Sequence, residues 1–101
     1  MTGRPAVAVT GLGVRCGAGA SPAALWESLV QRRSATRLHT FDDEGVVRYP
    51  ACPMTDFDPT GYLAPKEVRR ADRSVQLAVC AAVDAVEDAG GLHVPSRRRA
   101  V

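Results

Sequence analysis

The pattern of apolar and polar positions predicts a strand, a glycine-rich loop and a helix at the start of the chain. Residues 6–10 form a short apolar run, which is typical of a strand buried on both faces and parallel to its neighbours. Residues 11–19 contain four glycines and predict a loop. Ser21 is a suitable N-cap and Pro22 a suitable first residue for the helix that follows. The apolar stripe of this helix contains Leu25, Trp26, Leu29 and Val30.

The chain becomes irregular after this helix. Arg32 and Arg33 are expected in its last turn, where cations interact favourably with the helix dipole. Residues 34–63 show no clear period, and their turn-forming residues indicate loops. One short strand is expected at residues 49–52, where Pro50 limits it to the edge of a sheet.

A short basic helix is expected over residues 66–70, directly after Pro65. Its cations are spaced three, one and three residues apart, so in one continuous helix they share a face. These cations are Lys66, Arg69, Arg70 and Arg73. Such a face suits a phosphate group or an acidic protein surface, although charge patterns of this kind are often only solvated surface.

A longer helix is expected to begin after the N-cap Asp72, to run through Ala89 and to end at Gly90-Gly91. It is apolar around most of its circumference, which predicts burial in a larger body. Its expected polar side contains Gln76, Asp84, Glu87 and Asp88. After a turn at Pro95-Ser96, the last residues resemble the beginning of a further strand.

Composition places the chain in an ordinary globular class. Its 101 residues suffice for one small domain, with 46% apolar and 24% charged residues. The strand at residues 6–10 needs a neighbouring strand, and no second run of that kind occurs. We therefore expect the opening segment of a larger α/β domain, incomplete in this chain.

Charge and targeting patterns exclude several partners. A net charge of +2 is too balanced to indicate nucleic-acid binding. The sequence contains no apolar run of membrane-spanning length and no signal peptide, so we expect a cytoplasmic protein without a membrane partner. The three cysteines have no Cys-x-x-Cys spacing, so neither a disulfide framework nor a zinc site is expected.

The glycine loop invites comparison with dinucleotide-binding loops. Its glycines are Gly11, Gly13, Gly17 and Gly19. The two common fingerprints would need glycine at Cys16 or at Arg15, and no acidic residue follows at the distance that holds a ribose. Close packing is the favoured explanation of these glycines. The N-terminal fragment of an NAD(P)-dependent reductase remains an alternative, but no cofactor is expected.

None of the cysteines or histidines forms a convincing catalytic arrangement. Cys16 is the only cysteine with a neighbouring cation, Arg15, whereas Cys80 falls within an apolar helix and is expected to be an inert core residue. Neither His39 nor His93 is placed as a base for a thiol. We find no catalytic constellation and no metal site.

Taken in order, several segments resemble the β-ketoacyl-acyl carrier protein synthases. The segments are Val7–Val14, Leu25–Leu29, Arg33–Arg37 with Phe41-Asp42, Phe57–Pro59, Tyr62-Leu63, Lys66–Arg73, Gln76–Ala78 and Ala85–Gly90. The sequence Ser-Ala-Thr-Arg at residues 34–37 is more similar to type II polyketide ketosynthases than to fatty-acid enzymes. The resemblance implies the N-terminal part of a thiolase-like α-β-α-β-α layered fold. It also implies decarboxylative Claisen condensation by a homodimer or a ketosynthase heterodimer.

The resemblance also separates catalysis from partner recognition. The family's nucleophile lies in an Asp-Thr-Ala-Cys-Ser-Ser type of motif, which no cysteine here matches, and no histidine here matches its catalytic-histidine motifs. We therefore expect residues 1–101 to be a truncated and inactive opening segment of the β-ketoacyl synthase N-terminal domain. By position, Lys66, Arg69 and Arg70 match the basic segment that docks acyl carrier protein. A non-catalytic carrier-protein docking module, or a relic, is the second alternative.

Overall fold

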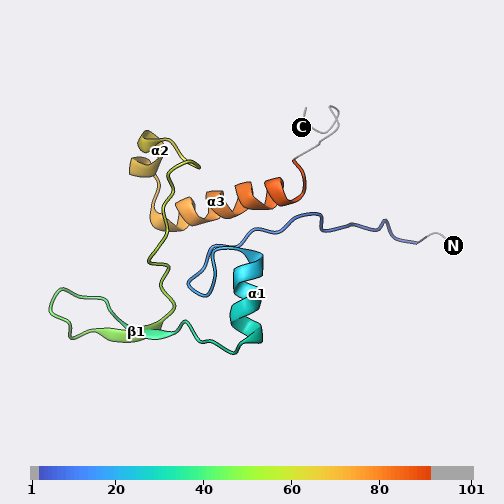
Figure 1. Ribbon diagram of the computed structural model, residues 1–101. Helices are drawn as coiled ribbons and strands as arrows, with labels where there is room; N and C mark the ends of the chain where they lie inside the picture. Colours follow the sequence, from blue (N-terminus) through green and yellow to red (C-terminus); the bar gives the residue numbers. More distant parts are fainter. Residues whose placement is uncertain (1–2, 92–101) are drawn as a thin grey trace.

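Residues 3–91 are described by the computed structural model, which contains helices and one two-stranded sheet (Figure 1). The elements are α1 (Pro22–Val30), β1 (Arg37–Thr40), β2 (Arg48–Ala51), α2 (Pro65–Arg70) and α3 (Arg73–Asp88). The expected turn at Pro95-Ser96, the strand after it and His93 lie outside the described residues.

The first helix begins where the sequence predicts and ends earlier. The Ser21 hydroxyl accepts a hydrogen bond of 3.1 Å from the Ala24 backbone N–H, and Pro22 is the first helical residue. At the other end, Arg32 has a φ of 55°, a left-handed conformation that no α-helix continues through. The Arg33 N–H then bonds the Ser28 carbonyl at 2.9 Å, which closes the helix as a Schellman-type terminus does. The prediction that Arg32 and Arg33 lie in the last turn is therefore wrong.

The predicted strand at residues 6–10 is also wrong for the described part of the chain. These residues belong to no strand, and Val7 and Val9 are 92% and 79% exposed. A strand needs a neighbour whose backbone groups complete its hydrogen bonds, and none of the described segments supplies one there. The segment instead runs past α3 without pairing (Figure 1).

The glycine loop packs directly on α3. A Cβ atom at Gly11 would overlap with the Ala85 carbonyl oxygen, and one at Gly13 would overlap with the Ala81 carbonyl oxygen. Only glycine allows backbone to approach backbone so closely. The favoured explanation of these two glycines as packing residues is confirmed.

The irregular middle of the chain contains a hairpin of β1 and β2. The strands are antiparallel, with Arg37 opposite Ala51 and Thr40 opposite Arg48. The predicted strand at 49–52 is confirmed within one residue, whereas β1 was not predicted. An aromatic group on one face explains the pairing, because the Phe41 ring lies 4.9 Å from His39 and 5.9 Å from Tyr49.

The longest helix, α3, has the predicted ends but a different polar side. The Asp72 carboxylate accepts a hydrogen bond of 3.1 Å from the Val75 N–H, and Gly90 follows the helix with a φ of 83°. The buried residues of α3 are Cys80 and Gln76, of which Gln76 was expected in solvent. Phe57 and Cys80 are the buried apolar residues of the described chain.

Candidate functional site

Helix α2 presents three cations to solvent. Lys66, Arg69 and Arg70 are exposed, and their spacing of three and four residues places them on one side of the helix. Within residues 3–91 the one ion pair joins Arg15 to Asp84, so none of the three cations forms an ion pair with a carboxylate of this part. We call Lys66, Arg69 and Arg70 the α2 basic surface.

Arg73 does not belong to this surface. The backbone is extended at Ala71 and Asp72, with ψ angles of 138° and 171°, so α2 ends before Arg73. The Arg73 guanidinium lies 4.6 Å from the ring centre of Phe57 and donates a hydrogen bond of 3.1 Å to the Phe57 carbonyl. The prediction that four cations share a face is wrong, because α2 ends after Arg70 and Arg73 belongs to the next helix, which Asp72 caps.

Gln76 joins α3 to the end of α2. Its Nε2 atom donates hydrogen bonds to the carbonyl oxygens of Val68, at 3.0 Å, and Ala71, at 2.9 Å. The last carbonyls of a helix have no partner inside the helix, so a side-chain amide is well suited to them. Sequence reasoning placed Gln76 on the solvent side. The signal that could have identified it is a single amide among apolar residues, six positions after the predicted helix end at Arg70.

A second polar group connects the glycine loop, the segment before α2, and α3. The Arg15 guanidinium donates to Asp84 at 2.7 and 2.9 Å and to the Tyr62 hydroxyl at 2.6 Å, and Tyr62 donates to Asp84 at 2.7 Å. The side chains of Arg15 and Asp84 are only 15% and 22% exposed. Asp84 is thus a packing residue, and its assignment to the solvent side is wrong.

The electrostatics of this group are consistent with its geometry. Burial alone would raise the pKa of Asp84, but hydrogen bonds from Tyr62 and Arg15 and the Arg15 charge outweigh it and lower the pKa. The hydrogen bond to Asp84 raises the pKa of Tyr62 and that of Arg15. The arrangement therefore favours a charged Arg15–Asp84 pair and a neutral Tyr62.

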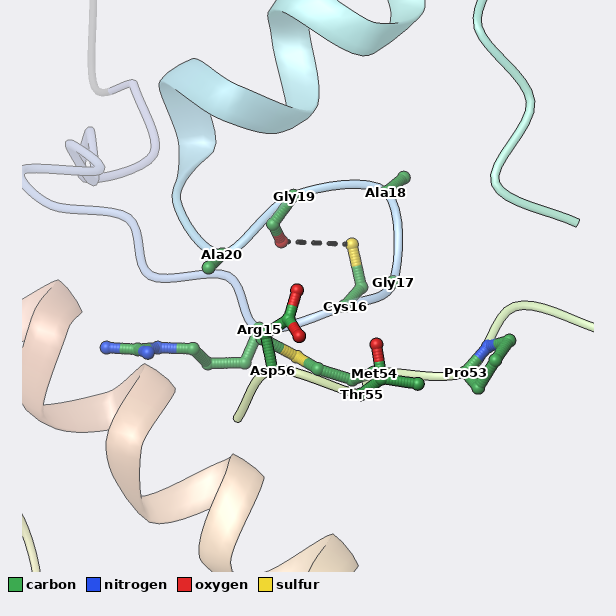
Figure 2. A pocket seen from close by; sticks show the side chains of 10 residues that line it. All are labelled: Arg15, Cys16, Gly17, Ala18, Gly19, Ala20, Pro53, Met54, Thr55 and Asp56. Atoms are coloured by element: carbon green, nitrogen blue, oxygen red, sulfur yellow. Dashed lines mark hydrogen bonds between the residues drawn. The ribbon is translucent and has the colours of Figure 1, made fainter. Parts of the chain in front are cut away.

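Two of the three cysteines, Cys16 and Cys80, lack the surroundings of a nucleophile. Figure 2 shows Cys16 in a tight turn, where its Sγ donates to the Gly19 carbonyl at 3.4 Å, while the Arg15 side chain points away toward α3. No histidine is among the residues that line the neighbouring shallow pocket. Cys80 is completely buried, and burial raises the pKa of its thiol. The prediction that Cys80 is a core residue is confirmed.

The described part of the chain offers neither a metal site nor a membrane-spanning helix. Residues 3–91 contain no group of three or more histidine, cysteine, aspartate or glutamate side chains placed to hold a metal ion. No helix in this range is long and apolar enough to cross a membrane. The α2 basic surface is therefore the candidate site that the geometry supports best.

Comparison with known proteins identifies the family. The sequence model of the β-ketoacyl synthase N-terminal domain matches residues 4–99. The chain belongs to the β-ketoacyl synthase family. It is 41% identical over 85 residues to the tetracenomycin polyketide synthase ketoacyl synthase alpha subunit of Streptomyces glaucescens, a match that covers 83% of this chain and 20% of the relative. The family resemblance drawn from the ordered segments is thus confirmed.

The relatives also distinguish branches of the β-ketoacyl synthase family. A polyketide β-ketoacyl synthase of Streptomyces cyaneus is 45% identical over 86 residues, again 83% of this chain and 20% of the relative. The 3-oxoacyl-acyl carrier protein synthase 2 of Vibrio harveyi is 29% identical over 85 residues, with the same coverage. This chain spans about a fifth of the length of these relatives. It is more similar to the polyketide proteins, as residues 34–37 predict.

Proposed function

We propose that this chain forms the opening part of a polyketide ketosynthase and supplies its docking surface for acyl carrier protein. The observation that carries the docking role is the exposed α2 basic surface, whose cations form no ion pair within residues 3–91, in a β-ketoacyl synthase N-terminal domain. The reaction would be decarboxylative Claisen condensation, in a thiolase-like layered fold completed by polypeptide beyond these residues. The assembled enzyme would be a homodimer or a ketosynthase heterodimer.

The surface has the chemistry that an acidic partner requires. Three like charges on one short helix raise the local concentration of an anionic partner and accelerate its association. The two arginines at the C-terminal end of α2 are also compatible with the helix dipole. Exposed pairs of this kind are worth about 0.2–1 kcal/mol each and are screened by salt. Docking should therefore be moderate in strength and sensitive to ionic strength.

The chemical step needs groups that this part of the chain does not bring together. In the proposed reaction, an acyl group passes from the carrier thioester to an enzyme cysteine. A malonyl unit then loses carbon dioxide, and its carbanion attacks the new thioester and releases the cysteine thiolate. Cys80 is buried, and Cys16 faces its own turn. We therefore propose that the 101-residue chain is inactive alone and contributes recognition of the carrier.

The test is a chimera in which this chain replaces the matching opening fifth of the Streptomyces glaucescens subunit. The α2 variant carries Lys66→Ala, Arg69→Ala and Arg70→Ala. It should raise KM for malonyl-carrier protein about tenfold, as expected for three weak ion pairs, and leave kcat nearly unchanged. The effect should shrink as salt is added.

The matched control removes the same charge elsewhere. Arg33→Ala, Arg37→Ala and Arg48→Ala delete three exposed cations on and beside the hairpin and should leave KM within about twofold, because surface changes away from an interface have small effects. An equal rise of KM in both triple variants would mean that carrier protein is attracted by the overall positive charge and not by the α2 basic surface in particular. A chimera that condenses nothing would contradict the ketosynthase assignment. If the isolated chain still bound carrier protein, it would be a docking module only.

A further inference from the structure

The two hydrogen bonds from Gln76 determine how α2 is held. Gln76 is buried, with only 7% of its surface exposed. Its amide donates hydrogen bonds to the Val68 carbonyl in α2 and to the Ala71 carbonyl just after it. The chain between α2 and α3 consists of Ala71 and Asp72 alone. Gln76 is therefore the α3 side chain whose hydrogen bonds reach across this connection.

Helix α2 needs such an anchor. It has six residues, and isolated helices shorter than about 12 residues are marginal in water. Its last carbonyls have no intrahelical donors, and partly buried carbonyls are costly to leave without a partner. A further hydrogen bond, from Arg73 at the start of α3 to the Phe57 carbonyl, holds the segment before α2. Gln76 acts on the end of α2 that carries Arg69 and Arg70.

We propose that Gln76 is a positioning residue for carrier-protein docking, which fixes the last turn of α2 and presents Arg69 and Arg70 in one orientation. This inference rests on the proposed function of the α2 basic surface. Charged side chains on a helix that is already ordered lose less conformational entropy when a partner binds. An amide suits the position because both facing groups are acceptors, whereas a carboxylate would repel them.

The test uses the same chimera with Gln76→Leu, which keeps most of the side-chain volume and removes the donor. KM for malonyl-carrier protein should rise about three- to tenfold, as expected when a buried hydrogen bond is lost, with kcat nearly unchanged. Gln76→Glu keeps the shape but replaces the donor with an acceptor, and it should raise KM by a similar factor. Gln31→Leu makes the same chemical change at an exposed residue after α1 and should leave KM unchanged.

A double-variant comparison separates positioning from general stabilisation. In the background of the α2 variant, adding Gln76→Leu should raise KM no further, because the side chains that Gln76 positions are gone. A further, independent rise would overturn the inference. So would a parallel fall of kcat in both Gln76 variants, which would mean that Gln76 supports the whole fold.

The outcomes also distinguish the two proposals. If the α2 variant raises KM and Gln76→Leu does not, the inference is wrong and the docking function stands. If the α2 variant leaves KM unchanged, the docking function is wrong and the inference falls with it.

Discussion

The guanidinium of Arg15 and the carboxylate of Asp84 form an ion pair of 2.7 Å although they are 69 positions apart in the sequence. Tyr62 completes the contact from a third segment, three residues before α2 begins. The group therefore ties the glycine loop, the approach to α2, and α3 to one another. These polar contacts hold the glycine loop against α3, where Gly11 and Gly13 also pack closely on the helix backbone.

Loss of either charge should destabilise this arrangement. Arg15→Ala and Asp84→Ala in the chimera are each expected to cost about 2 kcal/mol, between the values for exposed and fully buried pairs. The double variant should cost clearly less than the sum, because the two side chains interact directly. The measurement is the urea denaturation midpoint. Glu87→Ala, on the exposed side of α3, is the control, and purely additive effects would argue against a coupled pair.

The same pair predicts an acid-dependent stability. The pKa of Asp84 is lower in the folded state than its ordinary value of 3.8. Its ionised form therefore stabilises the fold fully above about pH 4, and the contribution is lost as the pH falls through the lower folded-state pKa. The difference in urea midpoint between the reference chimera and Asp84→Asn should shrink between pH 4 and pH 2. A difference that stays constant over this range would refute the assignment.

The glycine contact with α3 predicts a large effect from a small side chain. Gly13→Ala would place a methyl group against the Ala81 carbonyl, and we expect it to cost about 1–3 kcal/mol, as overpacking does. Gly3→Ala is the matched control, because nothing lies within 4 Å of a Cβ atom there. Comparison of the two urea midpoints in the chimera checks this. Equal midpoints would mean that the loop does not need close approach.

The isolated 101-residue chain should not unfold cooperatively. Phe57 and Cys80 are the buried apolar residues of its described part, while Val7, Trp26 and Leu29 remain largely exposed. So little buried apolar area cannot offset the conformational entropy of the ordered chain. A thermal melt followed by circular dichroism should be broad and shallow. A sharp transition of the monomer would disprove this.

Local signals in the sequence were enough for most of the helical structure. Ser21 and Asp72 cap the helices they were expected to cap, and Gly90 follows α3 in the left-handed conformation. These features depend on backbone groups within a few residues, so local sequence contains the necessary information. The end of α1 was misjudged because the left-handed conformation fell on Arg32, which lacks the glycine signal.

The sequence by itself determined the helices, the family, and the three cations of α2. Only the tertiary structure decided that Arg73 turns to Phe57, that Gln76 holds the end of α2, and that Asp84 pairs with Arg15. A polar residue on an apolar helix has the same local pattern whether its hydrogen bonds are made with water or with a distant part of the chain. The choice depends on which segments the fold brings within hydrogen-bond distance. For the same reason the strand-like run at residues 6–10 forms no strand here, since a strand is completed only by its neighbour.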